Sequence, residues 1–161
     1  MNAPAPQPFL ATLQAEREAT ARFVDLLRRE QRALSSGATD EIDALTPQKA
    51  SLAEELAHYG RARRSHLIGL GLPPDAHGMR SWAASHAQAG HVSAVWESLY
   101  ALAGQARALN ETNGVLIEMQ LQTCERSLAA LNDAAGRTTL YGPRGHAIAV
   151  QDAGSRTALR A

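Results

Sequence analysis

The stretch that decides the fold is VSAVWESLYALAGQARALNETNGVLIEMQLQTCERSLAAL, residues 92–131. Positions three or four residues apart carry apolar side chains, with two asparagines among them: Val92, Trp96, Leu99, Ala103, Ala106, Asn110, Asn113, Ile117, Leu121, Cys124, Leu128 and Leu131. This period predicts one amphipathic α-helix, which at about 1.5 Å per residue would be roughly 60 Å long. Such a helix needs a partner surface, because packing of its apolar face supplies most of its stability.

The segment before it, from Phe9 to about residue 34, can supply part of that surface. It carries apolar residues at helical spacing, namely Leu10, Leu13, Val24, Leu27 and Leu34. Glu16 and several arginines occupy the remaining positions, so we assign them to the solvent side. Ser35-Ser36-Gly37 ends this helix after about seven turns.

A second helix follows after a break short enough to predict an antiparallel neighbour. Thr39 or Asp40 is expected to cap it, because their side-chain oxygens can accept hydrogen bonds from the first turn. Thr46-Pro47 predicts an interruption and a restart, with Thr46 as the new cap. The apolar face then continues to Gly69 and Gly71.

The clearest connection in the chain runs from Gly71 to Gly78 and contains Pro73-Pro74, which cannot continue a helix. Residues 79–88 predict a short helix anchored by Trp82. We therefore expect an all-α fold, an elongated antiparallel helical bundle of coiled-coil hairpins with a long C-terminal helix. Its domain would span residues 9–135, between a disordered Pro-rich segment, 1–8, and a flexible tail, 136–161.

Composition limits the partners of this 161-residue chain. Sixteen basic residues balance sixteen acidic ones, so no overall field favours nucleic acid or an acidic membrane. No apolar run reaches the roughly 18 residues of a membrane span, and the N-terminus lacks the pattern of a secretory signal. With a single cysteine, Cys124, no internal disulfide can form, and we expect a cytoplasmic protein.

The motifs of catalysis and of metal or cofactor binding do not occur in the sequence. His77, His86 and His91 lie close together but lack metal-site spacing, so we assign them to loops and solvent. Cys124 falls in the apolar series and is expected to be a packed thiol. The arginines at 61, 63 and 64 are expected to form a solvated face. The sequence therefore predicts a binding protein without enzymatic activity, metal or cofactor.

Two features leave alternatives open. Asn110 and Asn113 place amides in an apolar seam, and Gly114 weakens a helix interior. They can fix register and let a neighbouring helix approach closely, or they can form a polar notch where a partner docks. Tyr141, in the segment Leu140-Tyr141-Gly142-Pro143-Arg144-Gly145, can fold back onto the helices or act as a short linear anchor on a partner.

In these two segments the chain resembles the FlgN family of flagellar type III export chaperones. Leu109-Asn110-Glu111-Thr112-Asn113-Gly114-Val115-Leu116-Ile117 is similar to the family's Leu-Asn-x-x-Asn-Gly-x-Leu-Ile segment. Thr139-Leu140-Tyr141-Gly142-Pro143-Arg144-Gly145 is similar to its terminal Leu-Tyr-Gly-x-x-Gly. Asn110, Asn113, Gly114 and Leu116 are therefore the family-motif positions of the long helix.

The resemblance implies a helical chaperone that binds the hook-filament junction proteins FlgK and FlgL before export. Its client-binding surface would lie on the end of the long helix, at Ile117, Leu121, Leu128 and Leu131. Leu140, Tyr141 and Gly142 would dock on the export-gate protein FlhA. The alternative is a structural coiled-coil protein that self-associates through the same apolar stripe and has no export client.

Overall fold

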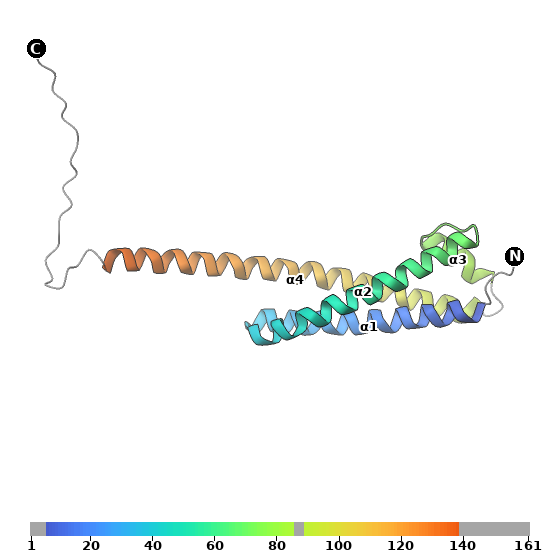
Figure 1. Cartoon of the computed structure of the whole chain (residues 1–161), viewed down its shortest axis with the longest axis horizontal. Helices are drawn as coiled ribbons and strands as arrows, with labels where there is room; N and C mark the ends of the chain where they lie inside the picture. Colours follow the sequence, from blue (N-terminus) through green and yellow to red (C-terminus); the bar gives the residue numbers. More distant parts are fainter. Residues whose placement is uncertain (1–5, 86–88, 139–161) are drawn as a thin grey trace, which may run out of the picture. The chain divides into compact units, whose positions relative to one another are not determined.

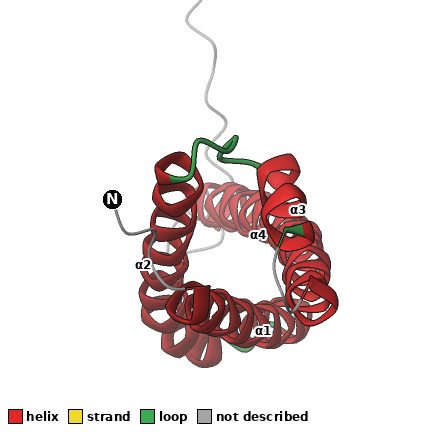
Figure 2. Ribbon diagram, turned by 90° about the vertical axis from the view of Figure 1, so that its right-hand side faces the viewer, coloured by secondary structure: helices red, strands yellow, loops and turns green. Residues whose placement is uncertain are grey.

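The computed structural model describes residues 6–85 and 89–138, and every regular element in that part of the chain is a helix (Figure 2). The four helices are α1 (Pro6–Ser36), α2 (Thr39–Gly69), α3 (Ala76–Ala84) and α4 (Ala89–Thr138). The predicted all-α class is confirmed. α1 begins three residues earlier than Phe9, since a helix's first turn tolerates proline, whose missing N–H has no partner there.

α1 and α2 form an antiparallel hairpin, and the first part of α4 runs parallel to α1 (Figure 1). Glu16 pairs with Arg63 and Glu30 with Lys49, so residue numbers rise along one helix as they fall along the other. Between α1 and α4, Gln14 contacts His91 and Arg28 donates a hydrogen bond to Gln105. These pairings fix an up-down-up arrangement of the three long helices.

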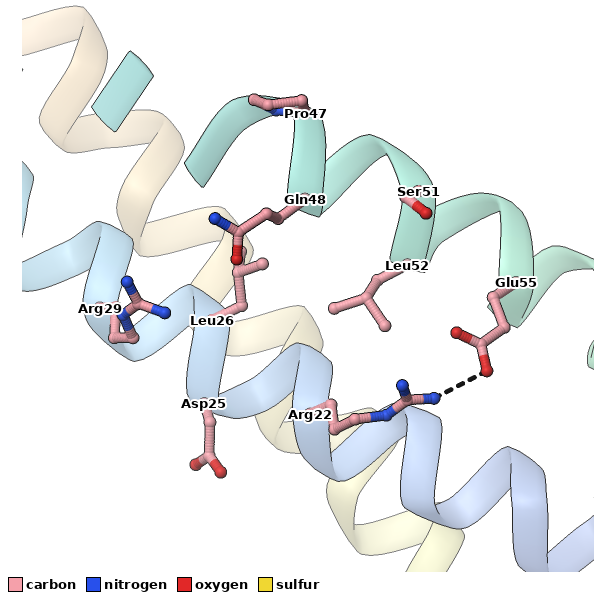
Figure 3. A pocket seen from close by; sticks show the side chains of 9 residues that line it. All are labelled: Arg22, Asp25, Leu26, Arg29, Pro47, Gln48, Ser51, Leu52 and Glu55. Atoms are coloured by element: carbon pink, nitrogen blue, oxygen red, sulfur yellow. Dashed lines mark hydrogen bonds and ion pairs between the residues drawn. The ribbon is translucent and has the colours of Figure 1, made fainter. Parts of the chain in front are cut away.

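An open groove runs between α1 and α2, where the side chains of Leu26 and Leu52 lie between two polar walls (Figure 3). Arg22 Nη2 donates a 2.7 Å hydrogen bond to Glu55 Oε1 across the groove. Leu26 is buried and Leu52 is half-buried, so this groove has an apolar floor beside an exposed ion pair. The ion pair joins α1 to α2.

Glycines with positive φ end both helices of the hairpin, at Gly37 (φ 70°) and Gly71 (φ 71°). After α1, the backbone N–H groups of Gly37 and Ala38 donate to the carbonyls of Leu34 and Ala33. Gly71 and Leu72 repeat this pattern after α2. Both ends are Schellman motifs, which satisfy the last carbonyls of a helix and favour glycine in the left-handed position. The predicted ends of these helices are thus confirmed.

The predicted start and interruption of α2 are wrong. Ala38 occupies the N-cap position and no side chain caps the helix, although Asp40 and Glu41 stand in its first turn, where the helix dipole favours carboxylates. Pro47 lies inside the uninterrupted helix, and the Thr46 hydroxyl donates to Ile42 O instead of capping a restart. Packing explains the continuity: Leu45 is buried and Lys49 is paired with α1 on either side of the proline.

α3 confirms the short helix anchored by Trp82, but it begins at Ala76 and ends at Ala84, a few residues earlier than predicted. Asp75 caps it, and its Oδ1 accepts hydrogen bonds from the backbone N–H groups of His77 and Gly78. These bonds lower the pKa of Asp75 from its ordinary value, the bond from Gly78 most, helped by the positive charges of His77 and Arg80. The cap signal in the sequence was Asp75 directly after Pro73-Pro74.

The core has two apolar clusters. The larger lies where α3 meets the three long helices and includes Phe9, Leu13, Leu67, Met79, Trp82, Ala83, Val92, Val95, Trp96 and Leu99. Phe9 packs edge-on against Trp82 with ring centroids 4.6 Å apart. The smaller joins α1 to α4 through Val24, Leu27 and Ala106. The predicted apolar face of the first helix is confirmed, since Leu13, Val24, Leu27 and Leu34 are buried.

The chain divides into two compact units, Met1–Glu118 and Met119–Ala161. The first contains both apolar clusters. The described part of the second, residues 119–138, is the end of α4, which continues beyond the predicted stop at Gly136 to Thr138.

Candidate functional site

An ion pair between a buried carboxylate, Glu16, and a half-buried guanidinium, Arg63, lies between the two apolar clusters and connects α1 to α2. Arg63 Nε donates to Glu16 Oε2 at 3.0 Å, and Arg63 Nη2 donates to Glu16 Oε1 at 3.1 Å. The guanidinium also lies over the Trp96 ring of α4, 5.4 Å from its centroid. Glu16 and Arg63 were both assigned to solvent from the sequence, and this assignment is wrong for each.

A second buried polar cluster joins all three long helices beyond the smaller apolar cluster. Lys49 Nζ of α2 donates to both carboxylate oxygens of Glu30 of α1, at 3.0 and 2.9 Å. Asn113 Nδ2 of α4 donates to Glu30 Oε2 at 2.7 Å and to the backbone oxygen of Leu27 at 2.9 Å. Because both partners of Nδ2 are acceptors, this position requires an amide and not a carboxylate.

The four family-motif positions have different environments. Asn113 is fully buried in the seam, where its bonds to α1 set the register of α4. Asn110 is exposed, so the expectation of two amides in the seam is wrong for this residue. Gly114 is also exposed and a Cβ there would meet nothing within 4 Å, which contradicts a close helix approach. Leu116 is half-buried and faces α1 residues Gln31 and Ser35 across a shallow groove.

The four expected client-binding residues are all exposed. Ile117 is 40% exposed, Leu121 and Leu128 are each 60% exposed, and Leu131 is 65% exposed. Cys124, expected to be a packed thiol, is exposed too. That expectation was wrong because the apolar period runs on into the second unit, where α4 is the only described element. The expected docking residues Leu140, Tyr141 and Gly142 lie outside the described residues.

The residues that sequence reasoning missed share one signal. Glu30 stands three residues after Leu27 and four before Leu34, and Lys49 stands four after Leu45 and three before Leu52. Glu16 likewise follows Leu13 by three. Charged residues in phase with an apolar face must be paired when the face is buried, because an isolated buried charge is strongly unfavourable. The phase therefore could have identified both buried clusters.

The described histidines do not form a metal site. His77 and His91 are exposed, and His91 contacts Gln14, while His86 lies outside the described residues. Among residues 6–85 and 89–138, no three His, Cys, Asp or Glu side chains are grouped as a metal site requires. No helix in the same part of the chain has both the length and the apolar character needed to cross a bilayer.

Comparison with known proteins agrees with this helical arrangement. The profile of the family described as FlgN protein matches residues 1–147. A crystal structure of a putative flagella synthesis protein FlgN from Pseudomonas aeruginosa aligns with a TM-score of 0.66 and 23% sequence identity. The alignment covers 71% of this chain and 89% of that one, so the two share a fold. No curated protein matches the sequence. Because the family profile spans most of its length, this chain belongs to the FlgN family.

Proposed function

We propose that this FlgN-family protein is a cytoplasmic flagellar export chaperone that binds FlgK and FlgL and delivers them to the export gate. Family membership supports a role in flagellar protein handling in general. One structural observation carries the more specific proposal: Leu121, Leu128 and Leu131 are exposed by 60% or more along one side of α4. Exposed apolar surface of this kind marks a site of interaction with a partner.

The chemistry of the leucine row suits a helical client segment. Its members are separated by seven and three residues, so they recur on one side of the helix every two turns or less. An amphipathic helix from a client can pack its own apolar side along such a row. The chaperone would thereby cover an aggregation-prone client segment until export, and release would require no covalent chemistry.

A pull-down with purified FlgK and FlgL, with and without their C-terminal segments, tests this proposal. We expect Leu128→Asp combined with Leu131→Asp to abolish capture of the intact clients. Met119→Asp is the matched control, because Met119 is 59% exposed but lies nine residues, about two and a half turns, before Leu128 and so faces the other way. Equal loss of capture in the control would contradict the assignment of this side of α4.

We further propose that Leu140, Tyr141 and Gly142 dock on FlhA. Support comes from the family profile, whose match includes these positions. Tyr141→Ala should weaken binding to the purified FlhA cytoplasmic domain and leave capture of FlgK and FlgL intact, whereas the double leucine variant should do the reverse. If either variant loses both activities equally, client binding and gate docking are not separate.

Sedimentation velocity distinguishes the chaperone from a self-associating structural protein. For a chaperone of this kind, the sedimentation coefficient should not depend on protein concentration, and the protein should capture its clients. A concentration-dependent oligomer that captures neither FlgK nor FlgL would establish self-association through the same leucines instead.

A further inference from the structure

The exposed leucine row of α4 has flanks of different chemistry. On one flank stand Glu118 and Glu125, seven residues apart, and Asn132 follows after another seven. A seven-residue spacing is close to two helical turns, so these side chains lie in one line beside Leu121 and Leu128. All three residues are exposed. None of the ion pairs among the described residues involves Glu118 or Glu125.

The other flank is uncharged and mostly small. It consists of Gln120, Ser127 and Ala134, each seven residues from the next. Small side chains let a second helix approach closely, so this flank restricts a partner by shape and not by charge. The acidic flank is therefore the charged edge of the apolar row. The rest of the surface that a partner would meet consists of the leucines, Cys124 and the uncharged flank.

From these flanks we propose that the client segment is an amphipathic helix with Lys or Arg along one edge of its apolar face, seven residues apart, paired with Glu118 and Glu125. This inference rests on the proposed function, since it names the chemistry of the client that the leucine row binds. The leucines supply the contact area. The two carboxylates, placed where the e positions of a coiled coil lie, select the partner and its orientation.

A second copy of this chain fits the row less well. Neither flank of the row carries a Lys or Arg that could meet Glu118 or Glu125 of another copy. Arg126 is two residues from Cys124, which places it on the opposite side of the helix. In an antiparallel pair of copies centred on Cys124, the Glu125 side chains would face one another and repel. Charge complementarity therefore favours a basic partner over self-association.

The test uses the full chain and two synthetic helical peptides that share a leucine heptad seam and differ only in the flanking residues, Lys in one and Glu in the other. Wild-type protein should bind the Lys peptide roughly tenfold more tightly than the Glu peptide at low salt, as two exposed ion pairs allow. The preference should shrink at about 0.5 M NaCl, because salt screens exposed charges. Glu118→Lys combined with Glu125→Lys should reverse the order of the two peptides.

The matched control is Glu54→Lys combined with Glu97→Lys, which makes the same change in net charge at exposed residues away from the leucine row. It should keep the wild-type preference for the Lys peptide. Equal affinity for both peptides, or a reversal of preference in the control as well, would overturn the inference.

Parallel measurements with purified FlgK and FlgL separate this inference from the proposed function. Capture of both clients at equal affinity by wild type and by Glu118→Lys/Glu125→Lys would overturn the charge inference and leave the chaperone proposal standing. Selective binding of the Lys peptide without capture of either client would support the inference about the surface and overturn its assignment to these clients. Weaker capture by the charge-reversed variant, with capture unchanged in the control, is the result we expect.

Discussion

Asn113 is the residue at which the sequence motif and the packing of the bundle meet. Its amide is fully buried and donates to Glu30 Oε2 at 2.7 Å and to the Leu27 carbonyl at 2.9 Å. Lys49 reaches the same carboxylate from α2. One carboxylate thus accepts bonds from two other helices, and its position along α1 sets the register of both. A hydrophobic residue of similar size could fill the space but could not pair with Glu30.

Asn113→Asp should destabilise the protein by roughly 3 kcal/mol at pH 7, because a carboxylate cannot donate and would lie against the carboxylate of Glu30. Repulsion between them raises a pKa of the new pair above its unfolded value. The penalty relative to wild type should therefore be greatest at neutral pH and shrink as the pH falls and the pair takes up a proton. Urea unfolding followed by circular dichroism at pH 7 and pH 4.5 measures the difference.

Asn110→Asp is the control for this change, since Asn110 is exposed and lies three residues earlier in the same helix. It should alter the free energy of unfolding by less than about 0.5 kcal/mol at either pH. A penalty for Asn113→Asp that is independent of pH would show that lost packing, and not charge repulsion, dominates.

α3 is held by its N-cap at one end and by a tight contact at Gly78 inside it. A Cβ on Gly78 would lie 1.8 Å from Pro73 O, in the connection that leads from α2. The adjacent Met79 and the nearby Trp82 belong to the larger apolar cluster, so α3 cannot move away without exposing them. The short connection and the core therefore restrain α3 from opposite sides.

Gly78→Ala should lower the free energy of unfolding by roughly 2–3 kcal/mol, since either the connection or the buried Trp82 must shift. Tryptophan fluorescence should shift to the red with it. Gly114→Ala is the contrasting variant: its added Cβ meets open space in a helix interior, so it should raise stability by up to about 1 kcal/mol. A destabilised Gly114→Ala protein would restore the interpretation that this glycine admits a neighbouring helix.

The N-cap of α3 gives stability that depends on pH. The backbone N–H groups of Gly78 and His77 bond the carboxylate of Asp75 and lower its pKa below the ordinary 3.8. A lowered folded-state pKa stabilises the fold fully above the unfolded value, and this contribution is lost as the pH falls through the folded value. The melting temperature of Asp75→Ala should be below that of wild type at pH 7, and the gap should narrow below about pH 3.8. Asp75→Asn keeps a cap without a charge, so its difference from Asp75→Ala should not vary with pH across this range. If the difference in melting temperature between wild type and Asp75→Ala does not vary with pH, the stabilisation comes from the capping hydrogen bonds and not from the charge of Asp75.

Helix ends and apolar faces could be predicted from the sequence because they depend on local chemistry. Gly37 and Gly71 adopt the left-handed conformation that their positions indicated, and the apolar phase of α1 matches its buried residues. Pro47 misled the prediction, since packing of α2 against α1 outweighs the one hydrogen bond that a proline removes. The phase of Glu16, Glu30 and Lys49 with the apolar faces marks them as buried, but spacing along one helix does not identify their partners in other helices, such as Asn113 for Glu30.

The apolar period of α4 extends through both units of the chain. In the first unit most of its in-phase residues are buried, namely Val92, Trp96, Leu99, Ala106 and Asn113, although Ala103 and Asn110 are exposed. In the second unit Leu121, Leu128 and Leu131 are exposed. Sequence periodicity predicted the row of residues but could not show which part of it is covered, because the period of one helix carries no information about the neighbours that pack on it.

This division predicts that stability and client binding can be separated by a single truncation. A chain ending at Glu118 keeps both apolar clusters and both buried polar clusters, so it should unfold cooperatively with a melting temperature within a few degrees of the full chain. It should no longer capture FlgK or FlgL, because Leu121, Leu128 and Leu131 are gone. Circular dichroism melts and pull-downs on the same preparations measure the two properties. A melting temperature lower by more than roughly 10 °C, which for a domain of this size corresponds to a loss of about 2–3 kcal/mol, would mean that residues 119–161 support the first unit. Retained capture would place the client site within the first unit, and the exposed leucines of α4 would then need another partner.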